Sequence, residues 1–130
     1  MSGLSNYTQN ALLNWIKGTA MPTAPTAVYV GLFSSDPTDA GSGTEVTTTI
    51  RTAGRPAATF GSITGNTSMA NSADVDFGSA AGAATASHFA LFSAATGGNL
   101  LASGALAESK SVVATTPVKF PTGALTVTID

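Results

Sequence analysis

Apolar residues recur with two different periods along the chain, and the first of these marks an α-helix. In residues 5–18 the apolar positions repeat every three or four residues, as they do on one face of a helix. Those positions are Tyr7, Ala11, Leu12, Trp15 and Ile16. Ser5 or Asn6 can cap the start, and Gly18 suits the position just past the end. We expect an amphipathic helix within residues 1–18 whose Trp15 and Ile16 seal one end of the core.

After residues 19–25, whose prolines end the helix, the period changes to the two-residue alternation of β-strands. Short apolar segments are separated by turns rich in glycine. The expected strands are residues 27–34, 44–51, 57–63, 73–77, 87–93, 100–106, 111–114, 118–120 and 124–129. This spacing is typical of a sandwich or small barrel. The sequence therefore predicts a mainly β fold, an antiparallel, jelly-roll-like β-sandwich with one N-terminal α-helix, as a single domain spanning residues 1–130.

Two of these strands share a phrase, VGLFSS at 30–35 and FALFSA at 89–94, and both of their faces are apolar. A strand with one wetted face would alternate apolar with polar residues, so we expect both strands to be covered on both sides. One cover would be the opposing sheet, and the other the N-terminal helix or a neighbouring subunit. The small residues Gly31 and Ala90 leave a notch for a packed element such as Trp15.

Charged residues make up 9% of the chain, where about 25% is typical. The surface should therefore consist mainly of short side chains, which lose little rotamer entropy when a neighbour covers them. This composition favours a subunit of an assembly. The alternative is an Ala- and Thr-rich β-domain with no obligate partner.

The sequence lacks the features needed for nucleic-acid binding, for disulfides or thiolate metal sites, and for spanning a membrane. The net charge is -2 with five scattered basic residues, so the basic stripe needed for nucleic-acid binding is absent. There are no cysteines for disulfides or thiolate metal sites, and no apolar run reaches the roughly 18 residues that span a bilayer. We expect a soluble, unprocessed chain that binds neither nucleic acid nor membranes.

Catalytic, metal-binding and cofactor-binding residues are not evident in the sequence. His88 is the only histidine, and we interpret it as a partly buried ring in an aromatic row. Residues 36–41 lack the ligand spacing of a calcium loop, so we expect Asp36 to start a turn in which its carboxylate accepts backbone N–H groups. We expect no cofactor and no enzymatic activity.

Asp74 and Asp76 alternate around one residue and should share a solvent-facing side of a strand. Two like charges on one face need water or a basic partner. The available partners are Arg51, Arg55, Lys110 and Lys119. The alternative, a pair of glycosidase carboxylates, is disfavoured because no aromatic platform for a sugar accompanies them.

Residues 36–56 form a long connection that contains several of the few charged residues. Long loops of compact domains are usually functional or mobile. We expect this extended loop or β-hairpin arm to reach a neighbouring protein. The residues expected to make partner contacts are Asp36, Asp39, Glu45, Arg51 and Arg55, with Arg51 and Arg55 the foremost.

Four phrases carry a resemblance to a known family. They are NALLNWI at 10–16, VYVGLFSSDPTDAGSGTEV at 28–46, SHFALFSAATGGNLLASGAL at 87–106 and GALTVTID at 123–130. In this order they resemble a family of small virion proteins of tailed bacteriophages, whose members are commonly labelled tail fiber proteins and which are similar to head decoration, or cement, proteins. Residues 47–56 depart from the usual glycine-rich phrase of that family.

The resemblance implies a structural protein located in the virion and made in the cytoplasm of a bacterial host. Since no shaft repeat is evident, the favoured role is a cement protein that binds the major capsid protein as a homo-oligomer, most simply a trimer, on the capsid surface. The first alternative is a tail fiber or baseplate protein that takes part in host attachment. The second is a carbohydrate-binding β-sandwich module, although Tyr7, Trp15 and Tyr29 are all assigned to packing.

Overall fold

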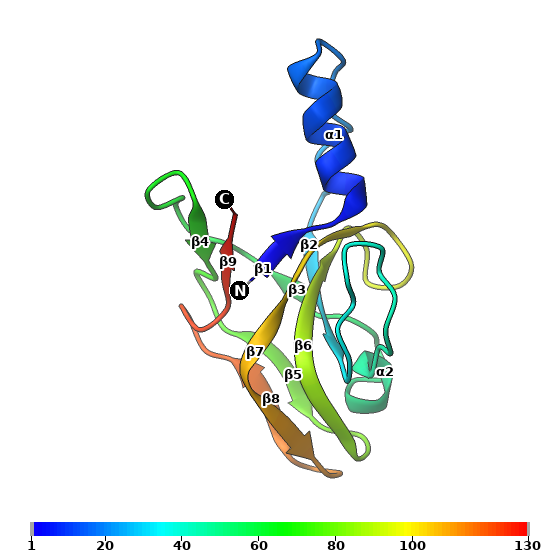
Figure 1. The fold of residues 1–130 in the computed structure, drawn as a ribbon. Coiled ribbons are helices and arrows are strands. Elements are labelled where there is room, and N and C mark those ends of the chain that lie inside the picture. The colour runs from blue at the N-terminus through cyan, green and yellow to red at the C-terminus, as the bar shows by residue number, and fades with distance from the viewer. Residues whose placement is uncertain (1, 130) are drawn as a thin grey trace.

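Antiparallel sheets and one projecting helix make up the structure, a computed structural model that describes residues 2–129 (Figure 1). The elements are β1 Ser2–Leu4, α1 Asn6–Ile16, β2 Val28–Phe33, α2 Thr47–Ile50, β3 Ala57–Ala58, β4 Ser68–Ala70, β5 Val75–Ser79, β6 Ala84–Phe92, β7 Leu100–Val112, β8 Pro117–Phe120 and β9 Thr126–Thr128. Within this range one sheet has the order β1-β7-β6-β2-β3, and two ribbons pair β4 with β9 and β5 with β8. The prediction of a mainly β, antiparallel fold with an N-terminal helix is confirmed, and the arrangement is consistent with a β-sandwich.

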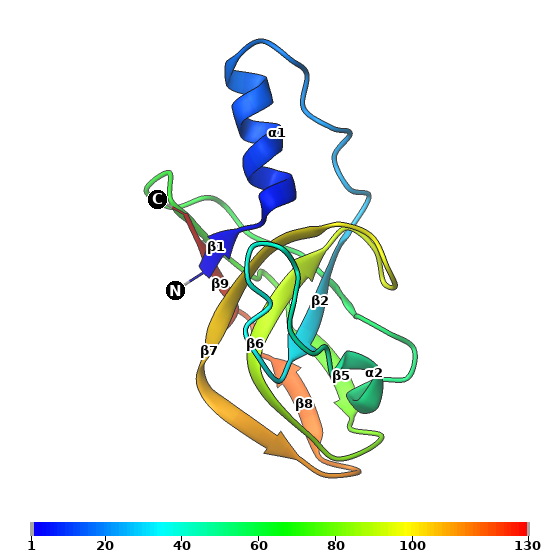
Figure 2. The same ribbon diagram turned by 45° about the vertical axis from the view of Figure 1, so that its right-hand side comes forward.

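The main core lies between the five-stranded sheet and the two ribbons. Val30 and Leu32 of β2 and Leu91 of β6 face inward from the large sheet, and Val75 and Leu125 come from the opposite side. All five are almost fully buried, with at most 2% of their surface exposed. Figures 1 and 2 show the β5–β8 ribbon alongside the far end of β6 and β7, and the β4–β9 ribbon near β1.

Asn71 joins the two ribbons from a buried position. Its side-chain amide donates to the carbonyl oxygens of Ala73 at 2.8 Å and Pro121 at 3.0 Å, and its Oδ1 accepts the N–H of Leu125 at 2.9 Å. Its backbone carbonyl also accepts the N–H of Gly123. One side chain therefore satisfies backbone groups at the ends of β5, β8 and β9 that would otherwise be unpaired.

Helix α1 begins as predicted but does not cover the core. The Ser5 side chain caps it by accepting the N–H of Thr8 at 3.1 Å. Trp15 and Ile16 are 60% and 72% exposed, and Ala11 is the residue of the helix that is buried. The prediction that Trp15 and Ile16 seal the core is wrong.

The reason is strand β1, which is too short to be recognised from its sequence. It pairs with Ala102 to Gly104 of β7 and fixes the start of α1 at the edge of the large sheet. From that point the helix runs away from the sheets, as both views show (Figures 1 and 2). Its last turn therefore stands clear of the core.

The strand pattern was predicted well in some segments and wrongly in others. β2, β6 and β8 lie close to their predicted ranges, but the segments 100–106 and 111–114 are parts of one strand, β7. β4 was not predicted. In the segment 44–51 a single bridge from Glu45 to Phe33 is followed by the short helix α2 rather than a strand.

We expect Asn71→Ala to lower the free energy of unfolding by about 2–4 kcal/mol, because it leaves several buried backbone groups without partners. Chemical denaturation with urea measures the change. Asn10→Ala is the matched control, because Asn10 lies on the exposed side of α1, and its effect should stay within about 0.5 kcal/mol. Equal effects of the two substitutions would contradict this role for Asn71.

Candidate functional site

A second, smaller apolar cluster lies on the outer face of the large sheet, opposite the main core. It consists of Phe33, Ala90 and Phe92, with Leu100 packed against it. The rings of Phe33 and Phe92 are stacked, with centroids 6.2 Å apart. The prediction that β2 and β6 are covered on both faces is therefore confirmed, although α1 is not the cover.

The notch at Gly31 is filled by a carboxylate. A Cβ atom at Gly31 would lie only 2.8 Å from Oε2 of Glu45 and 3.3 Å from the Phe92 ring. The side chain of Trp15 was expected in this place, but it lies exposed on α1. The absence of a side chain at Gly31 thus admits a charged group onto an apolar sheet face.

Arg55 meets that carboxylate with two hydrogen bonds. Its Nε donates to Oε2 of Glu45 and its Nη2 donates to Oε1, each at 2.8 Å. Nη1 donates to the carbonyl oxygens of Ala94 at 3.0 Å and Gly97 at 2.7 Å, and the guanidinium carbon lies 3.4 Å from the centre of the Phe92 ring. Planar bidentate pairing and stacking on an aromatic ring are the contacts for which arginine is suited.

We call Glu45 and Arg55, with these contacts, the Glu45–Arg55 clamp. The Thr47 hydroxyl donates to Oε2 of Glu45 at 2.6 Å and accepts the N–H of Leu32 on β2 at 2.9 Å. The clamp therefore ties three parts of the chain together: the segment 36–56, strand β2 and the loop 93–99. Figure 2 shows the segment 36–56 folded back over the sheet, near β2 and β6.

Burial and the contacts with Arg55 and Thr47 act on the pKa of Glu45 in opposite directions. Burial by itself raises this pKa, but the hydrogen bonds from Arg55 and Thr47, together with the charge of Arg55, outweigh burial. The net result is a pKa below the ordinary value of 4.5. Glu45 is therefore held as a carboxylate at neutral pH, and Arg55, which is 8% exposed, is not left as an unpaired buried charge.

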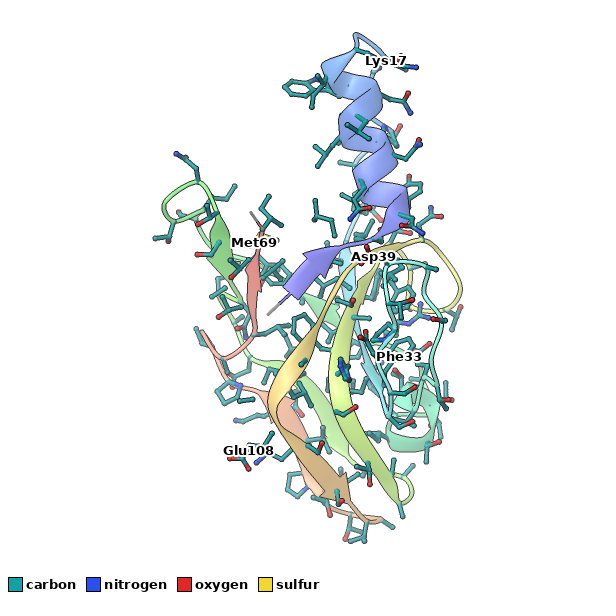
Figure 3. The ribbon with its side chains drawn as sticks, viewed as in Figure 1. Lys17, Phe33, Asp39, Met69 and Glu108 are labelled. Atoms are coloured by element: carbon teal, nitrogen blue, oxygen red, sulfur yellow. The ribbon has the colours of Figure 1, made fainter. Side chains whose placement is uncertain are left out.

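The other predicted contact residues lie outside the clamp. Oδ1 of Asp36 accepts the N–H of Thr38 at 2.9 Å, as expected for a turn. Oδ2 of Asp39, labelled in Figure 3, accepts a long hydrogen bond of 3.4 Å from Gln9 of α1. Arg51 donates to the carbonyl of Gly54 at 2.9 Å.

The five predicted contact residues therefore do not form one site. Glu45 and Arg55 come together inside the chain, whereas Asp36 and Asp39 line a polar hollow with His88, and Arg51 closes its own turn. Contact of Asp36, Asp39 and Arg51 with another protein remains a prediction. Contact of Glu45 and Arg55 with another protein also remains a prediction, although four N–H groups of Arg55 already donate within the chain.

The remaining candidate chemistry is also used in structural contacts. Asp74 pairs with Lys119 at 3.4 Å, which confirms the expected basic partner, and Thr122 donates its N–H and hydroxyl to the same carboxylate. These contacts, the Thr122 backbone bond first, lower the pKa of Asp74. Nδ1 of His88 lies 2.8 Å from the Ser87 hydroxyl. Over residues 2–129, no cluster of three or more histidine or acidic side chains is placed to hold a metal ion.

One family model matches residues 3–128, which include α1, the clamp and nearly all of the strands. It describes the Podophage GP4 fiber I protein gp80. The chain belongs to this fiber I family. The predicted resemblance to a phage virion protein family is thus confirmed, and the fiber I family makes the chain a phage structural protein. No curated protein matches the chain. In the described part of this family member, no helix has the length and apolar character needed to cross a membrane.

The clamp should make the stability of the protein depend on pH. Because the folded-state pKa of Glu45 lies below its unfolded value of 4.5, its contribution is fully present above pH 4.5 and is lost as the pH falls through the folded pKa. The unfolding free energies of wild type and Glu45→Gln should therefore differ at pH 7 and converge in acid.

Glu108→Gln is the matched control, since the Glu108 side chain is 78% exposed and lies 3.8 Å from Lys110. Its pH profile should follow that of the wild type. A gap between wild type and Glu45→Gln that stays constant from neutral pH to pH about 2–3, where an ordinary Glu is protonated, would contradict this assignment.

Proposed function

We propose that this chain is a structural subunit of a phage tail fiber, or of the part of the tail that carries a fiber, and that it acts in host attachment by binding without catalysis. The observation that carries the proposal is the match of residues 3–128 to the fiber I family. We therefore prefer the tail fiber or baseplate role to the cement role that the sequence favours. The family description concerns a fiber, and nothing in the described residues adds specific support for a capsid contact.

The physical character of the molecule suits such a role. The clamp fixes the longest connection against the sheet, which makes a stiff body, and charged residues are only 9% of the chain. The surface therefore offers many short, uncharged side chains that a neighbour can cover at small entropic cost. In a particle with several copies, weak contacts of this kind add up through multivalency.

The structure weakens one argument against the carbohydrate-binding alternative. The sequence argues against it because Tyr7, Trp15 and Tyr29 are assigned to packing. Tyr7 and Trp15 are in fact 40% and 60% exposed, so this objection fails for two of the three rings. What favours the virion role over a free-standing sugar-binding module is the family match.

The copy number of the chain in purified virions tests the proposal. Quantitative mass spectrometry with isotope-labelled peptides would compare it with the major capsid protein and with a tail protein of known stoichiometry as the internal control. A fiber or tail subunit should be present in a few to a few dozen copies. A ratio to the major capsid protein near unity, or a simple icosahedral fraction of it, would contradict the fiber role and support capsid decoration.

A further inference from the structure

The second half of strand β7 has a free edge. β6 pairs with β7 along one side, and β1 pairs along the other side only at residues 102–104. Figure 2 shows β7 running on beyond β1 at the margin of the fold, and the sheet order within residues 2–129 places no strand outside this part of it. Residues 107–111 are all exposed. Such an edge presents backbone N–H and C=O groups with which another strand can pair.

A break in the ladder with β6 frees the backbone in the middle of this edge. His88 pairs with Ala105 and Ala86 pairs with Lys110, so residues 106–109 have no partner on β6 in the described chain. β1 does not reach them either. A bulge bends its strand and leaves the extra residues unpaired. The backbone of residues 106–109 is therefore available to another chain.

The order of side chains along this edge is complementary to itself. Residues 106–112 read LAESKSV, with Ser109 at the centre. When two copies run antiparallel with Ser109 opposite Ser109, Glu108 of each copy lies opposite Lys110 of the other. Opposite charges directly across an antiparallel pair stabilise it. The edge thus provides two charge pairs to a second copy of the same chain in this arrangement.

The same register also matches apolar residues on the inner face of β7. Leu106 of each copy lies opposite Val112 of the other, and both residues pack against the main core of their own chain. Leu106, Glu108, Lys110 and Val112 all line one cavity of about 570 Å³ between β7 and β8. They share this face because alternate residues of a strand point the same way. The charge pairs and the apolar pairs therefore lie on one side of the joined sheet.

Charge excludes the neighbouring registers. Moving the centre by one residue from Ser109 puts Glu108 opposite Glu108, or Lys110 opposite Lys110, and like charges directly opposite are destabilising. Charged side chains usually deter pairing at a strand edge. Here their order deters these shifted registers and favours one, which makes the contact specific.

Within the chain these two charges have only a weak partnership. The side chains of Glu108 and Lys110 are 78% and 69% exposed, and they lie 3.8 Å apart. Glu108, labelled in Figure 3, stands at the outer margin of the fold. Exposed pairs of this kind contribute little to stability. A second copy offers each charge a partner directly across the strand pair.

We propose that two copies of this chain join along β7 as an antiparallel pair centred on Ser109, which makes one continuous sheet across the dimer. A two-fold contact of this kind uses the same surface on both copies and closes by itself. Residues 106–112 extend over about 24 Å and provide roughly six to eight backbone hydrogen bonds, beside the about ten of a standard interface. The sequence favours a trimer for the cement role, whereas this edge indicates a dimer.

Light scattering coupled to size exclusion, run on the full chain across a range of concentrations, tests the pair. The wild type should dimerise, and Glu108→Lys or Lys110→Glu alone should weaken the dimer about tenfold or more, while circular dichroism shows an unchanged fold. An equimolar mixture of the two variants should form a heterodimer, because every charge again meets its opposite. Lys17→Glu, at the exposed end of α1, is the matched control with the same change in net charge, and it should leave the dimer intact.

A monomeric or trimeric wild type would overturn the proposal, as would a dimer indifferent to both reversals or a mixture of the two variants that stays monomeric. Unfolding measurements that use Glu108 or Lys110 as exposed references belong at concentrations that keep the chain monomeric.

Cysteine substitution tests the register, since the chain has no cysteine of its own. Ser109→Cys places two thiols directly opposite each other, about 4.5–5.5 Å apart at Cβ, and mild oxidation should link the copies by a disulfide. Ser111→Cys is the matched control on the same face, because its two thiols lie four residues, or about 14 Å, apart and should remain unlinked. Equal linkage of the two variants would contradict a pair centred on Ser109.

Discussion

The fold of the segment 36–56 depends on one ion pair, that of the partly buried Glu45 and the buried Arg55. Burying an ion costs several kcal/mol, and this cost, which falls mainly on Arg55 here, is offset only when geometry and hydrogen bonding are nearly complete. Here the pairing is bidentate, the Thr47 hydroxyl and two loop carbonyls supply further hydrogen bonds, and the guanidinium stacks on Phe92. The requirement extends to Gly31, where any side chain would collide with the carboxylate. It also accounts for the short helix α2, which places Thr47 between Glu45 and the backbone of β2.

This arrangement shows what could be predicted from the sequence and what could not. Because both faces of β2 and β6 are apolar, double coverage followed from pattern alone, and so did the β-rich fold and the extent of α1. The sequence did not predict that Glu45 and Arg55 cover the outer face of β2 and β6. The two residues are ten positions apart in a loop, where charges normally face water. The small residues Gly31 and Ala90, which lie beside aromatic residues in the sequence, were the signal for a recess on this face. The direction of α1 depends on β1, three residues long, whose pairing with β7 is a tertiary contact that no local period encodes.

The structure differs from the sequence prediction in two ways that bear on function. Charges that seemed free to meet a partner hold the body together, whereas apolar residues that seemed to belong to the core stand in solvent on α1. This character suits a subunit of a phage particle, where a small body must meet neighbours repeatedly and stay rigid. The family match fits the same view, since it spans the body and the projecting helix together.

We conclude that Glu45 and Arg55 stabilise the fold through each other. A double-mutant cycle with Glu45→Gln and Arg55→Met, followed by urea unfolding, measures that coupling directly. We expect a coupling free energy of about 2–3 kcal/mol for this pair. For the exposed Glu108–Lys110 pair we expect roughly 0–1 kcal/mol. A coupling near zero for Glu45 and Arg55 would show that the two residues act independently and would contradict the clamp.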